Sequence, residues 1–421
     1  MEKNLTASIN SKPKDKVVHV LSIFPSQSET FIINFILETL KHNYSAQILA
    51  DNVSGLGVSS QQDLLLKNGL HETVETFNPK VSENKFNRLL MAIWVLLKNI
   101  KFSLIFLRTL NFKKYGLKSK TLKMWFQAAA FLRHRDAIVF HAHFGINGKL
   151  LAEMKEIGAI RGRVVTSFYG YDTFSTEETK NHFTNYYLEA FKASSHIITS
   201  SNYLFDNLID LNVPKEKVMV NSVGVDLEIF NYKNRSYDGI FNIITVGRLI
   251  KLKGQHLGIE IIKVLKERGY NVHYTIVGAG DEYEALLQKI KNLNLEDSIT
   301  LSGGGTQNGI IELLQQNHLF LMTSITDSSG RAEGQGLVSA EAQATGIPVV
   351  GFNSGGIPET IKNGETGYIV DEGNVEAMAN VVEVFIKDPK LIDIMGLEAR
   401  SFVEEKFNNR IQSQNIIKLY Q

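Results

Sequence analysis

Short apolar runs alternate with helical stretches along most of this chain, and this alternation constrains the fold more than any other feature. Bounded apolar runs of four to eight residues are typical of strands buried in a sheet. Strands that alternate with helices pair in parallel, with the helices as crossovers. The sequence therefore predicts an α/β fold with parallel sheets. The predicted strands are 17–24, 46–50, 137–144, 163–169 and 196–200 in the first half, and 241–247, 272–278, 298–301, 318–322 and 347–352 in the second.

The chain length predicts two domains, because 421 residues exceed what one ordinary hydrophobic core holds. Between the two groups of strands, residues 223–239 lose periodicity and become polar, as a linker does. We place the boundary near residue 235, which gives an N-terminal domain of residues 1–235 and a C-terminal domain of residues 236–421. The last helical stretch, from about residue 388, can pack on either domain.

Composition excludes several classes of protein. The sequence has no cysteine, so it has no disulfide, thiolate metal site or cysteine nucleophile. Residues 1–16 lack the apolar stretch of a signal peptide, and no apolar run reaches 18 residues, so we expect a cytoplasmic protein. The net charge of +1 argues against bulk attraction to nucleic acid.

The densest group of chemically useful residues lies at 333–341. Glu333 and Glu341 stand eight residues apart across Gly334-Gln335-Gly336-Leu337. Glycines at such a turn let backbone N–H groups approach an anion or sugar hydroxyls at a helix N-terminus. If this stretch is helical throughout, the two carboxylates lie about 12 Å apart along the axis and can reach different parts of one ligand.

A second group follows the strand 241–247. Arg248 and Lys253 lie five residues apart after Gly247, and such a pair can clamp a diphosphate, Arg through its planar fork and Lys as a point charge. Gly278 and Gly303 each end or follow one of the next two strands. Because ligands bind at the carboxyl ends of strands in open α/β sheets, we expect all these residues at one cleft.

The phrase around these residues resembles the donor-binding signature of glycosyltransferase family 4: a Glu, seven residues and a second Glu, then Gly-x-Pro-Val-Val and Gly-Gly-x-Pro-Glu. The resemblance implies the GT-B fold, in which two Rossmann-like domains with parallel sheets face each other across a cleft. It also implies that Glu333 contacts the hydroxyls of the donor sugar and Glu341 the ribose. Arg248 and Lys253 would then neutralise the departing nucleoside diphosphate in place of a metal ion. The implied donor-binding residues are Gly247, Gly278, Gly303, Gly334, Gln335, Gly336, Leu337 and Glu341.

The first half carries a narrower resemblance. Residues 24–32 resemble the Phe-Pro-x-x-Ser-Glu-Thr-Phe-Ile opening of transferases that build exopolysaccharides such as colanic acid. Ser28 and Glu29 are therefore candidates for the acceptor side of the cleft. The alternative for Ser28 and Thr30 is helix capping alone.

Two further phrases near the predicted cleft resemble the family. His141-Ala142-His143 ends a strand, whose alternation puts both His side chains on the same side. Either His can instead be a buried, hydrogen-bonded residue, and no further ligand at a definable spacing points to zinc. In Phe168-Tyr169-Gly170-Tyr171-Asp172 the family has a His near the donor sugar where this chain has Tyr169. A phenol can replace the hydrogen bond of that His but cannot become a cation near neutral pH. His143, Tyr169 and Asp172 are thus candidates for the cleft.

The resemblance implies a retaining, metal-independent glycosyltransferase that needs no cofactor beyond its nucleoside diphosphate sugar donor. Its acceptor would be a glycan, lipid-linked, in cell-surface polysaccharide synthesis. Two alternatives stay open: a GT-B epimerase that acts on the nucleotide sugar itself, and a non-enzymatic nucleotide-sugar binding protein. The presence of Arg248, Lys253, Glu333 and Glu341 argues against a decayed site.

The segment 80–135 is strongly basic. It holds thirteen Lys and Arg residues against one acidic residue, Glu83, together with Trp94 and Trp125. This composition is typical of helices that lie in a bilayer interface. We expect helices beside the acceptor side of the cleft that hold the protein to the anionic inner face of the cell membrane. The alternative is that their apolar faces complete the core of the first domain.

Overall fold

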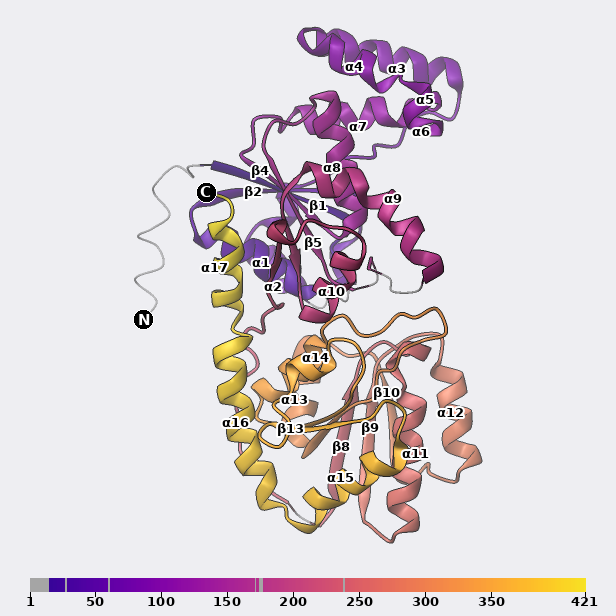
Figure 1. The fold of residues 1–421 in the computed structure, drawn as a ribbon, viewed down its shortest axis with the longest axis vertical. Coiled ribbons are helices and arrows are strands. Elements are labelled where there is room, and N and C mark those ends of the chain that lie inside the picture. Colours follow the sequence, from indigo (N-terminus) through magenta and orange to yellow (C-terminus); the bar gives the residue numbers. More distant parts are fainter. Residues whose placement is uncertain (1–14, 27–28, 60, 171, 174–176, 238) are drawn as a thin grey trace.

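The computed structural model describes residues 15–26, 29–59, 61–170, 172–173, 177–237 and 239–421. Figure 1 shows two α/β units, one above the other, each with a central sheet and helices packed around it. All pairs of neighbouring strands are parallel. The prediction of two Rossmann-like domains with parallel sheets is confirmed.

The N-terminal sheet has the strand order β3-β2-β1-β4-β5-β6-β7, and the C-terminal sheet the order β10-β9-β8-β11-β12-β13. The order therefore reverses between β1 and β4 in one sheet and between β8 and β11 in the other, and ligands bind at such switch points. The strands are β1 (Asp15–Phe24), β2 (Tyr44–Val53), β3 (Val74–Thr76), β4 (Val139–His143), β5 (Arg163–Phe168), β6 (Ser194–Thr199), β7 (Val218–Val220), β8 (Phe241–Val246), β9 (Val272–Val277), β10 (Ile299–Gly303), β11 (Leu319–Met322), β12 (Val349–Phe352) and β13 (Gly367–Val370).

The ten predicted runs all coincide with strands. The sequence did not predict β3, β7 and β13, because three or four residues at a sheet edge form no clear apolar run. The helices are α1 (Thr30–Lys41), α2 (Gln62–Lys67), α3 (Lys85–Lys98), α4 (Ser103–Thr109), α5 (Phe112–Tyr115), α6 (Leu117–Lys120), α7 (Lys123–Leu132), α8 (Gly145–Ile157), α9 (Glu177–Ala193), α10 (Asn202–Asp210), α11 (Gln255–Glu267), α12 (Tyr283–Asn292), α13 (Gln307–Gln316), α14 (Leu337–Ala344), α15 (Val375–Lys387), α16 (Lys390–Lys406) and α17 (Asn409–Lys418).

Each sheet has its own hydrophobic core. In the N-terminal unit, β4 is buried along its whole length and packs with α7 and α8. In the C-terminal unit, β8, β9 and β12 pack with α11 and α15. Among the described residues no strand joins the two sheets, and the connection from β7 to β8 contains the predicted boundary near residue 235. That boundary stays a proposal.

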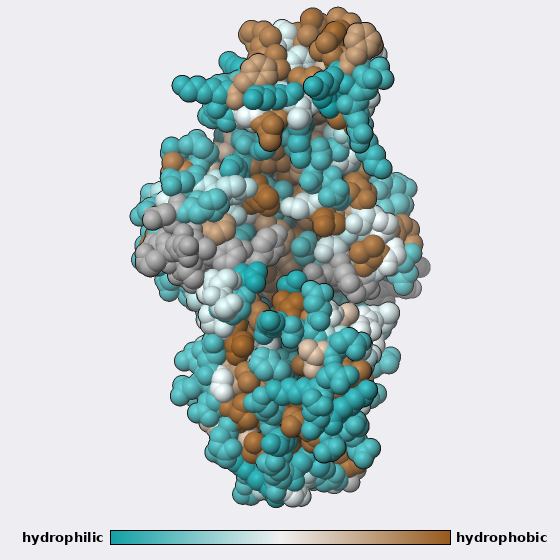
Figure 2. Space-filling model, turned by 90° about the vertical axis from the view of Figure 1, so that its right-hand side faces the viewer, coloured by the Kyte–Doolittle hydropathy of each residue, from teal (hydrophilic) through white to brown (hydrophobic). Residues whose placement is uncertain are grey.

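Helices α3 to α6 lie at the end of the N-terminal unit that is farthest from the C-terminal unit, at the top of Figure 1. The prediction that they lie beside the cleft is therefore wrong. Trp125 is also not at the surface: it is 6% exposed, and its Nε1 donates to the Ala92 carbonyl at 3.2 Å. Twelve large apolar side chains of this region are exposed, and we call this surface the apolar cap (Figure 2). Its members are Phe86, Leu89, Leu90, Met91, Ile93, Trp94, Leu97, Ile100, Leu104, Leu107, Phe112 and Leu117.

None of the described helices is by itself long and apolar enough to span a membrane. The pair formed by α3 and Ile100–Thr109 reaches that length and composition only together, and it is bent by 96°.

Candidate functional site

Two adjoining cavities lie between the domains. The larger has a volume of about 1030 Å³ and the smaller about 400 Å³. Tyr169, Arg248, Lys253 and Glu333 line both cavities, so they form the wall where the two meet. The smaller cavity is about the size of a small-molecule pocket, and the larger one has room for a second substrate.

Arg248 reaches this wall from the loop that follows β8. The loop lies directly against the one that follows β9, since Gly247 N donates to Val277 O and Leu249 N to Ala279 O, both at 2.9 Å. A Cβ on Gly278 would lie 1.9 Å from the Gly247 carbonyl oxygen. Gly278 therefore serves the packing that positions Arg248 and lines neither cavity.

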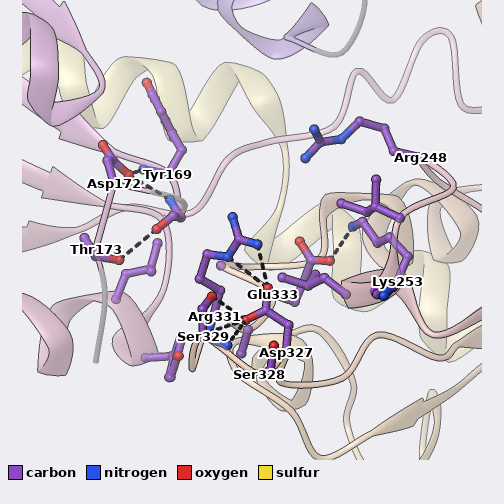
Figure 3. Close-up of a pocket in the computed structure, with 18 of the residues that line it drawn as sticks. Tyr169, Asp172, Thr173, Arg248, Lys253, Asp327, Ser328, Ser329, Arg331 and Glu333 are labelled. Carbon is purple, nitrogen blue, oxygen red and sulfur yellow. Dashed lines mark hydrogen bonds and ion pairs between the residues drawn. The ribbon is translucent and has the colours of Figure 1, made fainter. Parts of the chain in front are cut away.

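Lys253 ends the 3-10 turn Lys251–Lys253, and Gly254 then starts α11 with a φ of 61°. The Lys253 ammonium forms an ion pair with the Glu333 carboxylate, and the Ser324 hydroxyl donates to the same carboxylate at 3.2 Å. Both side chains are largely buried, with 16% and 15% of their surface exposed. Figure 3 shows this pair beside Arg248. The Glu333 carboxylate thus neutralises the charge of Lys253.

Glu333 and Glu341 are not on one continuous helix. Gly336 has a φ of 83°, and α14 begins only at Leu337, so the condition of a helix throughout 333–341 is not met and the separation of about 12 Å does not apply. Glu341 projects from α14 into the smaller cavity. Burial raises the pKa of the Glu341 carboxyl to about 7. Its charge therefore depends on pH near neutrality.

Gly334 and Gln335 contact the N-terminal domain. A Cβ on Gly334 would lie 2.5 Å from the Tyr169 carbonyl oxygen, and the Ser201 hydroxyl donates to the Gly334 carbonyl at 2.5 Å. The Gln335 amide bonds both backbone groups of Val223, at 2.8 and 3.0 Å. These two residues therefore hold the domains together as well as lining the cavities.

On the N-terminal side, the Tyr169 hydroxyl points away from the cavity wall (Figure 3). It bonds His143 Nδ1 at 3.0 Å, and His143 Nε2 bonds His19 Nδ1 at 3.1 Å. Burial lowers the pKa of His143 well below its usual value and that of His19 to about 3, so both rings are neutral. His143 lines neither cavity, and the structure assigns it to the support of Tyr169.

His19 also brings a third imidazole to His141 and His143, a grouping that the sequence did not reveal because His19 lies 122 residues before His141. The three rings offer nitrogens within 4.8 Å of one another. However, the His141 and His143 rings stack with centroids 4.5 Å apart, and both His141 nitrogens bond other groups, Ser167 at 2.8 Å and Tyr420 at 2.6 Å. Stacked rings direct their lone pairs in parallel planes rather than toward one ion. The cluster is therefore arranged as a hydrogen-bonded core.

Asp172 lies at the edge of the larger cavity, but its carboxylate is used by the fold. It accepts the backbone N–H of Gly145 at 2.8 Å, of Gly170 at 3.1 Å and of Tyr169 at 3.3 Å. The side chain is 2% exposed, and burial raises the pKa of the carboxyl to about 6. Asp172 thus attaches the loop that contains Tyr169 to the first residue of α8.

Most of the other residues predicted for the site line one of the two cavities. Glu29 precedes α1 and lines the smaller cavity, where burial raises the pKa of its carboxyl to about 7. Gly303 lines neither cavity, and Ser28 lies outside the described residues. The smaller cavity also contains Gly247, Gln335, Gly336, Leu337 and Glu341, and the larger contains Gly334.

Two parts of the larger cavity were not predicted from the sequence. Phe183, Tyr186 and Tyr203 form an aromatic wall from α9 and α10. Opposite, Asp327 accepts from Arg331 Nε at 2.9 Å and from the Ser329 backbone at 2.9 Å, which fixes a loop at the cavity edge (Figure 3). The aromatic residues within 182–187 could have predicted the aromatic wall from the sequence. No pattern in the sequence indicated the loop that contains Asp327.

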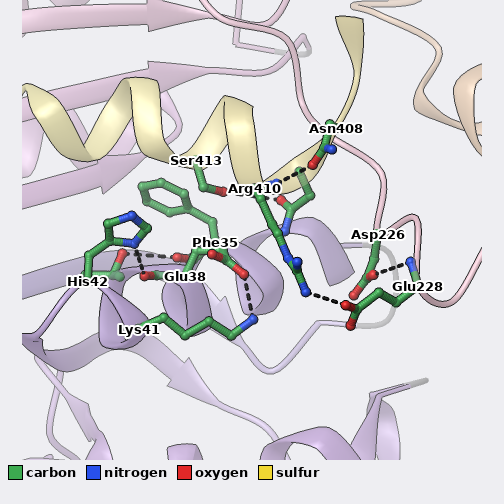
Figure 4. A network of polar contacts seen from close by, with 11 residues as sticks. Phe35, Glu38, Lys41, His42, Asp226, Glu228, Asn408, Arg410 and Ser413 are labelled. Atoms are coloured by element: carbon green, nitrogen blue, oxygen red, sulfur yellow. Dashed lines mark hydrogen bonds and ion pairs between the residues drawn. The ribbon is translucent and has the colours of Figure 1, made fainter. Parts of the chain in front are cut away.

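The domains are joined by further polar contacts. The Glu359 carboxylate accepts the N–H groups of Asn202 and Tyr203 at 2.9 Å, which caps the start of α10 from the other domain. The chain also crosses back at its end, where α17 packs against α1. Figure 4 shows Arg410 of α17 paired with Glu228 beside Glu38 and Lys41 of α1.

Comparison with known proteins identifies relatives of nearly equal length. A family model described as glycosyl transferases group 1 matches residues 228–402. The WcaL protein of Escherichia coli, provisionally described as a colanic acid biosynthesis glycosyltransferase, is 30% identical over 412 residues, which cover 96% of this chain and 99% of that protein. The amylovoran biosynthesis glycosyltransferase AmsK of Erwinia amylovora is 29% identical over 401 residues, which cover 94% of this chain and 97% of that protein.

Solved structures share the whole architecture. The structure of HepE from Anabaena in complex with UDP and glucose has a TM-score of 0.72, with 96% of this chain and 99% of that chain covered at 19% identity. A glycosyltransferase from Rickettsia africae has a TM-score of 0.68 at 18% identity, over 97% and 98% of the two chains. At these identities the likeness concerns the fold.

Proposed function

The chain belongs to the group 1 glycosyltransferases, and from that premise we propose that it moves a sugar from a nucleoside diphosphate sugar to a glycan hydroxyl with retention of the anomeric configuration. We further propose that the product belongs to a cell-surface polysaccharide. The names of WcaL and AmsK, which refer to colanic acid and amylovoran biosynthesis, support this choice of product class.

The observation that carries the proposal is the shared wall between the two cavities. Arg248, Lys253 and Glu333 stand where a donor in the smaller cavity would meet an acceptor in the larger one. Glu341 lines the smaller cavity but not the larger one, and we propose that it accepts hydrogen bonds from the ribose hydroxyls and Glu333 from those of the donor sugar. The diphosphate then lies against the two cations.

Catalysis in this proposal is electrostatic. As the bond between the sugar and the phosphate breaks, negative charge grows on the leaving oxygen, and Arg248 and Lys253 stabilise it. The acceptor hydroxyl attacks from the same face and passes its proton to the departing phosphate. The two cations supply the charge that a divalent metal would otherwise provide, so we propose that neither a metal nor another cofactor is required.

Lys253 must exchange partners for this to happen. In the structure it is paired with Glu333. A donor offers both groups a new partner at once, since its phosphate can take Lys253 and its sugar hydroxyls can take Glu333. After the exchange Lys253 is paired with the phosphate and the Glu333 carboxylate is hydrogen-bonded by the sugar hydroxyls, so neither buried charge is left without a partner.

The larger cavity favours transfer over epimerisation of the nucleotide sugar, because an epimerase needs no second substrate. Phe183, Tyr186 and Tyr203 line it on the N-terminal side. Aromatic rings with polar tips suit the mixed apolar and hydroxylated surface of a sugar. We therefore place a glycan acceptor there, carried on a lipid at the inner face of the cell membrane.

A donor panel tests the proposal. The purified protein is incubated with individual nucleoside diphosphate sugars, with and without lipid-linked glycan acceptors, and release of nucleoside diphosphate is measured. We expect release that depends on one donor and is accelerated by acceptor, and that persists in EDTA. Equal turnover of a donor into an epimer without acceptor would instead support the epimerase.

A further inference from the structure

We propose that the apolar cap is a lipid-binding surface, which inserts into the headgroup region of an anionic membrane. The inference deepens the membrane location stated above by assigning the contact to particular side chains. It starts from a concentration of exposed apolar groups: the cap holds twelve of the 24 large apolar side chains that are exposed among the described residues, within the short segment 86–117. Figure 2 shows them gathered at the end of the molecule.

The central stretch of helix α3, residues 89–97, is apolar on all sides of the helix. Its inner face packs on the domain core through Ala92, Val95 and Leu96, and Ala92 is the one residue of this fully described helix that is buried. The outer face carries Phe86, Leu90, Ile93 and Leu97 at helical spacing. A helix without a polar face needs an apolar environment on its outer side as well.

The segment that carries the apolar cap is also rich in positive charge. Of the thirteen basic residues in 80–135, five bond acidic side chains or backbone carbonyls. The other eight form no ion pair among the described residues: Lys80, Lys85, Arg88, Lys98, Lys101, Lys113, Lys120 and Lys123. An apolar centre with basic neighbours complements an anionic bilayer, where apolar groups enter the acyl boundary and cations meet the headgroups.

Trp94 joins the two parts of the surface. Its ring is 57% exposed, and the Lys98 ammonium lies 3.6 Å from the ring centroid. Tryptophan is enriched at the depth where the bilayer changes from polar to apolar. The 96° bend between α3 and the segment that follows it lets both lie along a surface instead of crossing it.

A second copy of the chain would fit the apolar cap less well than a membrane does. A two-fold contact places the same patch on both sides, so the eight unpaired cations of one copy would face those of the other. Opposed like charges in an interface are costly. An anionic lipid surface compensates these charges instead.

Vesicle flotation tests the proposal without using catalysis. Phosphatidylcholine vesicles with and without phosphatidylglycerol are mixed with the full-length protein at low and high salt. We expect flotation with the anionic vesicles at low salt and release as salt screens the charges. Failure here would leave the transferase proposal standing, and a failed donor panel would leave this result standing.

Two sets of variants separate the contributions. Trp94→Ser with Leu97→Ser should weaken binding at least about tenfold, whereas Ile394→Ser with Leu397→Ser, which are equally exposed on α16, should not. Replacing Lys85, Lys98 and Lys101 by Gln should weaken binding to anionic vesicles about a hundredfold, at about fivefold for each lysine. The matched control replaces Lys266, Lys291 and Lys390, which are exposed on the other domain.

Fluorescence gives a local readout, because the sequence has two tryptophans and Trp125 is buried. On binding to vesicles, Trp94 emission should shift to the blue and become protected from an aqueous quencher, and Trp94→Phe should lose the effect. Unchanged Trp94 emission on vesicle-bound protein would overturn the proposal. So would a dimer in solution that the Trp94 and Leu97 variant converts to monomer while flotation stays as in the wild type.

Discussion

The two sides of the cleft use similar-looking motifs in opposite ways. On the C-terminal side, Arg248, Lys253, Glu333 and Glu341 turn their charged groups into the cavities. On the N-terminal side, His143, Asp172 and the Tyr169 hydroxyl are directed into their own domain. The first side is the one that we propose holds a charged ligand, whereas the second holds a backbone loop in place. A polar motif near a cleft is therefore a better candidate for a ligand contact when it lines a cavity than when its polar atoms bond the interior of its own domain.

The comparison predicts the largest effect for the cations of the C-terminal side. Arg248→Ala and Lys253→Ala should each lower kcat by about a hundredfold to a thousandfold, which corresponds to about 2.7–4 kcal/mol, because each removes charge stabilisation that grows during bond breaking. Steady-state rates of proteins shown to be folded by circular dichroism provide the measurement. Lys266→Ala, at an exposed position on α11, is the control. Near-normal turnover in either site variant would remove the assignment of the diphosphate.

Asp172 should affect the free energy of unfolding and not the catalysed reaction. Its pKa is raised from 3.8 to about 6 by burial, so the folded state holds the proton more tightly than the unfolded state. The stability that this proton contributes is present below about pH 4 and is lost as pH rises through about 6. Relative to Asp172→Asn, the wild type should lose up to about 3 kcal/mol over that range. Urea unfolding of both proteins across the range measures the difference, and a difference independent of pH would contradict the prediction.

Gly334 lies where the two sides touch. Gly334→Ala places a Cβ 2.5 Å from the Tyr169 carbonyl oxygen, so the domains must move apart. We expect kcat/KM to fall about tenfold to a hundredfold, in line with about 1–3 kcal/mol for overpacking, and the radius of gyration in small-angle scattering to increase. Gly57→Ala, whose Cβ would meet nothing within 4 Å, should change neither quantity. A loss of activity without any change in radius would assign Gly334 to the ligand alone.

The smallest effect on activity is expected at Tyr169. Tyr169→Phe removes a hydroxyl that bonds His143, so the KM for donor should change by less than about threefold. The free energy of unfolding should fall by about 1–3 kcal/mol, because His143 Nδ1 is left buried without a partner. An increase of KM for donor by more than about tenfold with unchanged stability would place the hydroxyl at the donor.

Much of the fold and of the C-terminal side could be predicted from the sequence, since parallel strands bring the residues after them to one edge. Arg248 and Glu333 are 85 residues apart in sequence, yet each follows a strand of the same sheet. The N-terminal side was less predictable, because whether a polar atom faces a cavity depends on partners in other strands. His19 is such a partner of His143. Likewise, Trp94 and Trp125 belong to one basic segment, and only the contact of Trp125 with Ala92 shows that one of them is core.

The ion pair between Lys253 and Glu333 also bears on how the enzyme releases its product. We propose that a complete donor offers hydroxyls to Glu333 and phosphate to Lys253, whereas the nucleoside diphosphate left after transfer offers only phosphate. In this proposal Glu333 competes with the product for Lys253, and re-formation of the ion pair favours departure of the nucleotide. The same competition would weaken the binding of free nucleotides and limit product inhibition. Glu333→Gln removes the competitor, so we expect this variant to hold nucleoside diphosphate more tightly than the wild type in calorimetry, whereas equal or weaker binding would count against the exchange.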